Sequence, residues 1–136
     1  LKELSMNSVF IMSVPSQKKK KKNLSRLNMS NCGITDITNE IGSLKNLTYL
    51  ELSFNELTSL PAEIGEMEKL REMYLGGNQL KDLPVEIKNL DETLQILSLS
   101  QAKSSSEEYS GNPISKETVD KIQQWLPDTK IIFIWN

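Results

Sequence analysis

Few residues of this chain could do catalytic chemistry. The 136 residues include no histidine and a single cysteine, Cys32. A Ser-His-Asp triad, a multi-cysteine or histidine metal site and an intramolecular disulfide are therefore excluded. Glu51 and Glu72 could in principle serve as the paired carboxylates of a glycosidase, but the sequence does not indicate the deep pocket that this reaction needs. We therefore predict that the chain is not an enzyme, with no catalytic residue, no metal site and no cofactor.

Charge and hydropathy narrow the choice of partner further. Five of the sixteen basic residues lie in the lysine run 18–22, and the other eleven stand against eighteen acidic residues. A body this acidic argues against nucleic acid as the main partner, and the lysine run is typical of a solvated loop. No segment approaches the roughly 18 consecutive apolar residues of a membrane span.

A repeat of 23 residues must position the remaining side chains. A leucine recurs at Leu1, Leu24, Leu47 and Leu70, and again at Leu94 after one extra residue. The third unit reads LTYLELSFNELTSLPAEIGEMEK, with Asn55 and Pro61 at positions that Asn78 and Pro84 occupy in the fourth. The second unit has the same apolar positions and carries Cys32 in place of the asparagine.

The physics of the repeat predicts a strand, a turn and a return segment in every unit. The two leucines of L-x-L lie on one face of a strand, because side chains alternate with a period of two. The buried asparagine amide can satisfy backbone groups of neighbouring turns. Cys32 fits the same slot as a small buried residue, so we do not expect its thiol to act in catalysis. No unit can bury its apolar stripe alone, so the units must stack into one continuous core.

The pattern LxxLxLxxNxLxxLPxxIxxLxx resembles that of leucine-rich repeat proteins over nearly the whole chain. The closing segment GNPISKETVDKIQQWLPDTKIIF and the wording LTYLELSFNELTSLPAEIG are similar to those of leptospiral members of this family. The resemblance implies an α/β fold: a right-handed solenoid with a concave parallel β-sheet, short helical or 3₁₀ convex segments and a C-terminal helix-strand cap. We predict one domain over 1–136, with repeats starting at 1, 24, 47, 70 and 94.

The repeat pattern breaks at both ends. The first unit has lysines at convex apolar positions, so we expect a strand followed by a lysine-rich loop. Removing residues 101–110 restores the register of the fifth unit, which predicts an exposed insertion loop there. The cap then covers 111–136: a helix with Ser115 as N-cap ends before Pro127, and a strand begins at Lys130. Its edge is expected to be covered by the cap helix in a monomer, and a dimer through this edge is the alternative.

Residues flanking L-x-L should cover the concave face, and they include the one informative patch. We predict that Tyr49 and Tyr74 occupy equivalent positions on neighbouring strands and stand side by side. Aromatic residues with a polar rim are typical of protein-binding surfaces, although such rings can also merely shield a sheet. The predicted partner-binding residues are Arg26, Asn28, Tyr49, Glu51, Phe54, Glu56, Glu72 and Tyr74.

The leptospiral resemblance implies a secreted or surface-exposed module that binds host cell-surface proteins, such as cadherin-type adhesion receptors or matrix components. The alternative is an intracellular scaffold that docks on a phosphatase or a small GTPase. The segment 9–14 is too short for a signal peptide, and its charge follows the apolar part. Because the chain begins at Leu1 without a polar cap, we expect either a fragment of a longer protein or a chain from which a leader was removed.

Overall fold

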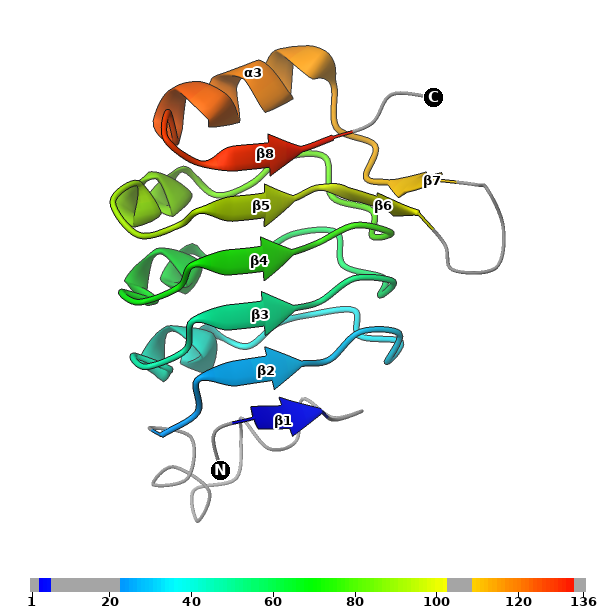
Figure 1. Ribbon diagram of the computed structural model, residues 1–136. Helices are drawn as coiled ribbons and strands as arrows, with labels where there is room; N and C mark the ends of the chain where they lie inside the picture. The colour runs from blue at the N-terminus through cyan, green and yellow to red at the C-terminus, as the bar shows by residue number, and fades with distance from the viewer. Residues whose placement is uncertain (1–2, 6–22, 103–108, 134–136) are drawn as a thin grey trace.

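The computed structural model describes residues 3–5, 23–102 and 109–133, and the side chains of 23–100 and 111–133. The expected lysine-rich loop at 18–22 lies outside these residues. Figure 1 shows a single parallel sheet whose strands stack along the long axis of the molecule.

Six short strands form this sheet, in the order β1-β2-β3-β4-β5-β8. The strands are β1 (Glu3–Ser5), β2 (Arg26–Asn28), β3 (Tyr49–Glu51), β4 (Glu72–Tyr74), β5 (Ile96–Ser98) and β8 (Lys130–Ile132). The register places the central leucine of one repeat beside that of the next: Leu27 pairs with Leu50, and Leu50 with Met73. Each strand therefore turns the same face toward the core, as the repeat predicts.

The chain returns from each strand through a 3₁₀ helix on the opposite side of the core. These helices are η2 (Asn39–Ser43), η3 (Ala62–Glu66) and η4 (Val85–Leu90). Pro61 and Pro84 precede η3 and η4, where a fixed φ suits helix entry, and Thr38 takes this place before η2 with its hydroxyl accepting a bond from Glu40 N–H. Gly65 allows η3 to lie against the backbone of Glu86 in η4, where a Cβ would collide.

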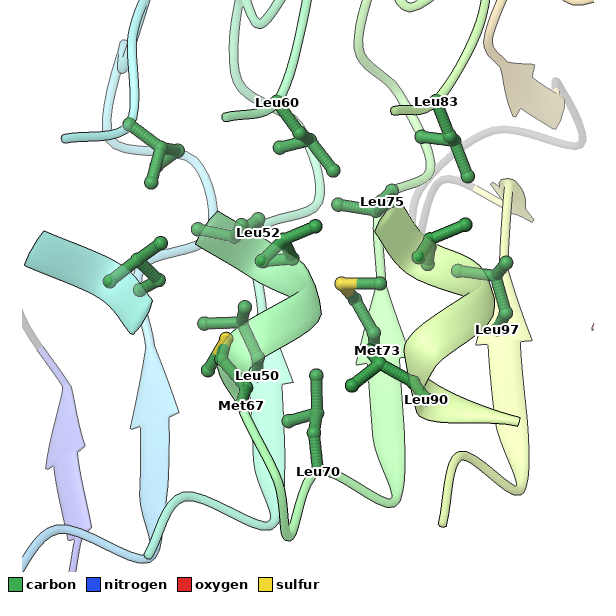
Figure 2. Close-up of a cluster of buried hydrophobic side chains, with 14 of the residues drawn as sticks. Leu50, Leu52, Leu60, Met67, Leu70, Met73, Leu75, Leu83, Leu90 and Leu97 are labelled. Atoms are coloured by element: carbon green, nitrogen blue, oxygen red, sulfur yellow. The ribbon is translucent and has the colours of Figure 1, made fainter. Parts of the chain in front are cut away.

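The core fills the space between the sheet and the 3₁₀ helices. Figure 2 shows Leu50, Leu52 and Met67 of one repeat packed against Met73, Leu75 and Leu90 of the next. All of these side chains are at most 1% exposed. The leucine positions of the repeat thus form one continuous core that crosses every repeat boundary, as stacked units require.

An asparagine ladder closes the turn that follows each strand. The Asn55 side chain accepts hydrogen bonds from the N–H groups of Cys32 (2.9 Å) and Ile34 (3.1 Å). It also donates to the carbonyls of Met29 and Leu52, both at 2.9 Å. Asn78 and Asn112 make the corresponding bonds one and two repeats later. Asn112 therefore occupies this position in the fifth repeat, even though the chain leaves the repeat pattern after Ser100.

The excursion between Ser100 and Asn112 begins and ends as a hairpin. Strands β6 (Ser100–Ala102) and β7 (Tyr109–Gly111) pair in antiparallel fashion, Gln101 facing Ser110. Sequence analysis predicted a loop over 101–110, and its two ends are instead strands. The serine- and glutamate-rich composition of this segment does not indicate strand pairing. In Figure 1, β6 continues from the end of β5 and leaves the parallel sheet.

The C-terminal segment covers the last repeat. Helix α3 (Lys116–Trp125) begins at the N-cap Ser115, whose hydroxyl accepts a bond from Thr118 N–H, and it buries Ile122 against the core. Strand β8 then joins β5 in parallel as the last strand of the sheet. In Figure 1, α3 lies next to β8 at this end of the molecule. The predicted solenoid with its helix-strand cap is confirmed.

Candidate protein-binding surface

Side chains at the first and third positions of each strand project from the sheet on the side opposite the core. In β2 these are Arg26 and Asn28, in β3 Tyr49 and Glu51, and in β4 Glu72 and Tyr74. The middle residues Leu27, Leu50 and Met73 are buried. Strand alternation therefore presents six of the eight predicted partner-binding residues on one face, which we call the concave face.

Three of these side chains form a continuous row across β2, β3 and β4. The Arg26 guanidinium carbon lies 3.9 Å from the centre of the Tyr49 ring. The Tyr49 and Tyr74 ring centres are 5.3 Å apart, with the ring planes tilted by 43°. These distances are typical of a cation–π contact followed by a tilted aromatic pair. We call Arg26, Tyr49 and Tyr74 the aromatic row.

The two tyrosines do not occupy equivalent positions, contrary to our prediction. Tyr49 is in register with Glu72, and Glu51 with Tyr74. The rings meet along the diagonal between neighbouring strands, which long aromatic side chains can span. The two glutamates lie on the opposite diagonal, so aromatic and carboxylate side chains alternate across β3 and β4. The prediction that the rings stand side by side is correct, but the positions assigned to them are wrong.

Glu51 is more buried than a binding residue on an open face would be. Only 8% of it is exposed, and its Oε1 accepts a hydrogen bond from Ser53 N–H at 2.9 Å. Asn28 makes the same local contact one repeat earlier, where its Oδ1 accepts from Ser30 N–H at 3.0 Å. These bonds satisfy backbone donors at the strand end, so both side chains support the turn.

Glu72 makes its hydrogen bond to a side chain of the aromatic row. The Tyr74 hydroxyl donates to Glu72 Oε1 at 2.7 Å. Burial raises the pKa of the Tyr74 phenol, and this hydrogen bond and the Glu72 charge raise it further. Burial is also the main cause that raises the pKa of Tyr49, with the Glu51 charge adding to it and Arg26 opposing it. Both phenols therefore stay neutral to a higher pH than an ordinary tyrosine does.

Phe54 and Glu56 lie outside the strands, in the turn that follows β3. Phe54 has a left-handed backbone with φ of 59°, and its ring lies over Gly77, which has φ of 73°. Asn31 holds the corresponding place after β2, with φ of 53°. Glu56 follows the ladder residue Asn55 and is exposed. The structure thus places these two predicted residues at the rim, while the aromatic row lies on the sheet.

Sequence reasoning missed the last part of the concave face. Ile96 and Ser98 of β5 pair with Lys130 and Ile132 of β8, so the sheet continues by one strand beyond the repeats. Ile132 is in register with Ser98, which in turn is in register with Tyr74. The alternation of Ile131 and Ile132 predicted a strand, but the break in the repeat hid the neighbour with which it pairs.

The described residues include no candidate metal site. Over 23–102 and 109–133, no group of three histidine, cysteine, aspartate or glutamate side chains is placed to hold a metal ion. The Cys32 thiol lies 3.2 Å from the Ser30 carbonyl in the ladder position that the repeat assigned to it. None of the helices in this part of the chain is long and apolar enough to span a membrane.

Comparison with known proteins agrees with this geometry. A leucine-rich repeat family model matches residues 22–80. A solved leucine-rich repeat protein of Leptospira interrogans is 37% identical and superposes with a TM-score of 0.75. The match covers 96% of this chain and 29% of that one, so the chain spans under a third of the length of this relative. No curated protein sequence matches the chain.

Repeats of this family generally form protein-binding scaffolds without enzymatic activity. The repeat spacing, the parallel sheet, the asparagine ladder and both matches agree with one another. The chain is a leucine-rich repeat protein, similar to one from Leptospira interrogans.

Proposed function

We propose that this chain is a non-enzymatic module that binds a host cell-surface protein through its concave face. The single observation that carries the proposal is the aromatic row. Arg26, Tyr49 and Tyr74 come from three neighbouring strands and contact one another in sequence. Tyrosine and arginine are the residue types that contribute most often to the energy of protein interfaces.

The row is also held in place before any partner arrives. Arg26 lies over the Tyr49 ring, and the Tyr74 ring on the next strand contacts the Tyr49 ring. The Tyr74 hydroxyl is held by its hydrogen bond to Glu72. Both tyrosines are half-buried, so each ring keeps a fraction of its surface open to solvent. A partner therefore meets side chains that have already lost most of their conformational freedom, which lowers the entropic cost of binding.

The size of the sheet sets the expected affinity. Strands of three residues span about 10 Å, and six strands about 4.8 Å apart give a regular surface of about 300 Å². A stable interface buries about 800 Å² on each partner. The turns at the rim, including Phe54, must therefore contribute, and we expect micromolar affinity for the isolated chain.

Our choice of partner class rests on the resemblance of the repeats and the cap to leptospiral members of the family. We propose a secreted or surface-exposed location and a partner such as a cadherin-type adhesion receptor or a component of the extracellular matrix. The mixed charge of the concave face, with Arg26 and Lys130 each two strands from Glu72, suits a folded protein surface better than a polyanion.

Binding of the purified chain to immobilised receptor ectodomains and matrix proteins tests the proposal. We expect micromolar binding to one member of the panel, and a loss of at least about 30-fold in the double variant Tyr49→Ala/Tyr74→Ala, because truncated hot-spot residues cost about 2 kcal/mol or more. Val85→Ala is the matched control, since Val85 is an exposed apolar residue of η4 on the other side of the molecule. Failure of the wild-type chain to bind any ectodomain or matrix protein would contradict the proposal.

A further inference from the structure

The aromatic row ends at Tyr74 beside the Glu72 carboxylate, which forms no ion pair with the side chains that the structure describes. In the described ranges, the ion pairs are Lys45 with Glu68 and Lys121 with Asp82, all outside the concave face. Glu72 uses Oε1 to accept the Tyr74 hydroxyl, and no second partner contacts its carboxylate in this part of the chain. Glu72 is half-buried, so its charge is held at the surface next to an aromatic ring.

The neighbouring strand on that side supplies no charge. On β5, Ile96 is in register with Glu72 and Ser98 with Tyr74. The next basic residue, Lys130, lies one strand further, in register with Ile96. The concave face thus has a carboxylate and an aromatic ring side by side, bordered by an uncharged strand.

At the other end of the row, an arginine side chain is already stacked on a tyrosine ring. The guanidinium of Arg26 lies over the Tyr49 ring at 3.9 Å, and Tyr49 is in register with Glu72. An arginine is favoured there because its planar group stacks on an aromatic face and its N–H groups point outward to acceptors. Tyr74 and Glu72 repeat the ring and add the acceptor, but among the described side chains no cation lies over the Tyr74 ring.

We propose that the partner supplies this arginine, whose guanidinium stacks on the exposed part of Tyr74 and pairs with Glu72. The inference rests on the proposed function of the concave face and names the chemistry that the face selects. Burial is the main cause that raises the pKa of Tyr74, and the hydrogen bond and charge of Glu72 raise it further; this contribution of Glu72 agrees with a locally negative setting that favours a cation.

A purely apolar partner fits this position less well. It would cover Glu72 without replacing the water around the charge, and a buried carboxylate without a partner is costly. A lysine would satisfy the charge, but its compact ammonium lacks the flat surface that stacks on a ring. A guanidinium satisfies the ring and the carboxylate together.

Three short peptides test the inference on the full chain labelled with ¹⁵N. Their sequences are acetyl-Ser-Gly-X-Gly-Ser-amide, with X being arginine, its uncharged isostere citrulline, or lysine. With the arginine peptide we expect saturable amide shifts at Glu72, Tyr74 and Ser98 in the millimolar range. The citrulline peptide should bind at least about threefold more weakly, because it lacks the charge that a surface cation–π contact needs. The lysine peptide should also bind more weakly than the arginine peptide, because its ammonium has no planar group to stack on the ring.

Variants separate this site from general attraction to an acidic protein. Glu72→Gln and Tyr74→Leu should each weaken arginine binding about threefold or more, and unchanged spectra elsewhere would show that both remain folded. Glu92→Gln, which removes an exposed carboxylate after η4, is the charge-matched control and should leave binding unchanged. Shifts spread over the acidic surface, equal binding of the lysine peptide, or insensitivity to Glu72→Gln would each overturn the inference. Receptor binding that depends on Tyr49 and Tyr74 could still stand in those cases, so the two proposals fail separately.

Discussion

At the scale of single residues, Asn55 and Asn78 hold the turns that carry the rim of the concave face. Each amide joins the backbone of its own repeat to that of the repeat before it. Apart from the half-buried Cys32 N–H, the groups that these amides satisfy are buried, where water is not available as an alternative partner. The asparagine is therefore required by hydrogen bonding, and an apolar residue of similar size cannot replace it.

Asn78→Ala should lower the free energy of unfolding by about 1–3 kcal/mol, the cost of one buried unsatisfied group. It leaves Leu57 N–H without its partner, whereas the carbonyls of Leu52 and Leu75 each lose one bond and keep those from Asn55 and Asn112. Urea denaturation measures the effect. Gln79→Ala, which removes the exposed amide next to it, should change stability by less than about 0.5 kcal/mol. Equal effects of the two variants would contradict the role of the ladder.

The tyrosines of the aromatic row should ionise above their ordinary range. The unfolded chain titrates its phenols near pH 10, and in the folded chain the pKa values of Tyr49 and Tyr74 are raised, chiefly by burial. Their contribution to stability is thus complete below about pH 10 and falls as the pH rises through the folded pKa values.

Tyrosinate absorbance of the folded chain should therefore show two phenols titrating later than in urea. The variant Tyr49→Phe/Tyr74→Phe should lose both late transitions, and its stability should depend less on pH above 10. Three phenols that all titrate near pH 10 while circular dichroism still reports a folded chain would rule out the packing described for the row.

The sequence predicts which residues lie on the concave face, but their contacts with one another depend on the register between strands. The alternation around L-x-L identified Arg26, Tyr49 and Tyr74 as outward-facing, and the structure places them there. The diagonal contact of the rings and the burial of Glu51 depend on how neighbouring strands align and on a local bond to Ser53. A glutamate that caps its own turn has the same sequence signature as one that faces a partner.

At the scale of elements, glycine sets how closely successive 3₁₀ helices approach. Gly42 and Gly65 follow Ile41 and Ile64, and a Cβ at either position would meet the next helix. Lys88 holds the corresponding place after Ile87 in η4, which contacts helix α3 instead of a further 3₁₀ helix. The change from glycine to lysine thus occurs at the last of the stacked 3₁₀ helices. The change is visible in the sequence, but its reason is visible only in the packing.

Gly65→Ala should destabilise the protein by about 1–3 kcal/mol, the usual cost of overpacking, because the new methyl group meets the backbone of Glu86. Lys88→Ala, made at the equivalent position, should change stability by less than about 0.5 kcal/mol since Lys88 is exposed. Thermal unfolding compares the two variants. A stabilising effect of Gly65→Ala would mean that η3 and η4 lie further apart than the structure has them.

The turns after β3 and β4 are coupled through Phe54 and Gly77. Alanine at position 77 would hold a left-handed backbone, which costs about 1–2 kcal/mol, and its Cβ would lie 2.6 Å from a ring carbon of Phe54. We expect Gly77→Ala to cost more in the wild-type chain than in a Phe54→Ala background. A double-mutant cycle in urea measures the difference, and strict additivity would show that ring and glycine do not touch.

At the scale of the whole molecule, the 23-residue period predicted the solenoid because every repeat must satisfy the same packing rule. The period could not predict the hairpin β6–β7 or the place of β8, since both follow the break after Ser100. Asn112 completes the ladder from beyond this break, so the hairpin interrupts the sequence of the fifth repeat without interrupting its hydrogen bonds. Non-local pairing of this kind has no periodic signal.

The position of a bound protein on the molecule decides whether the concave face is the binding surface. The measurement is the map of amide and methyl chemical-shift changes on the labelled chain when it binds a receptor ectodomain from the panel. If a partner binds the concave face, we expect changes at Tyr49, Tyr74 and the methyl groups of Ile96 and Ile132, and none at Val85 on η4. Changes centred on η3 and η4, with the aromatic row unaffected, would contradict it.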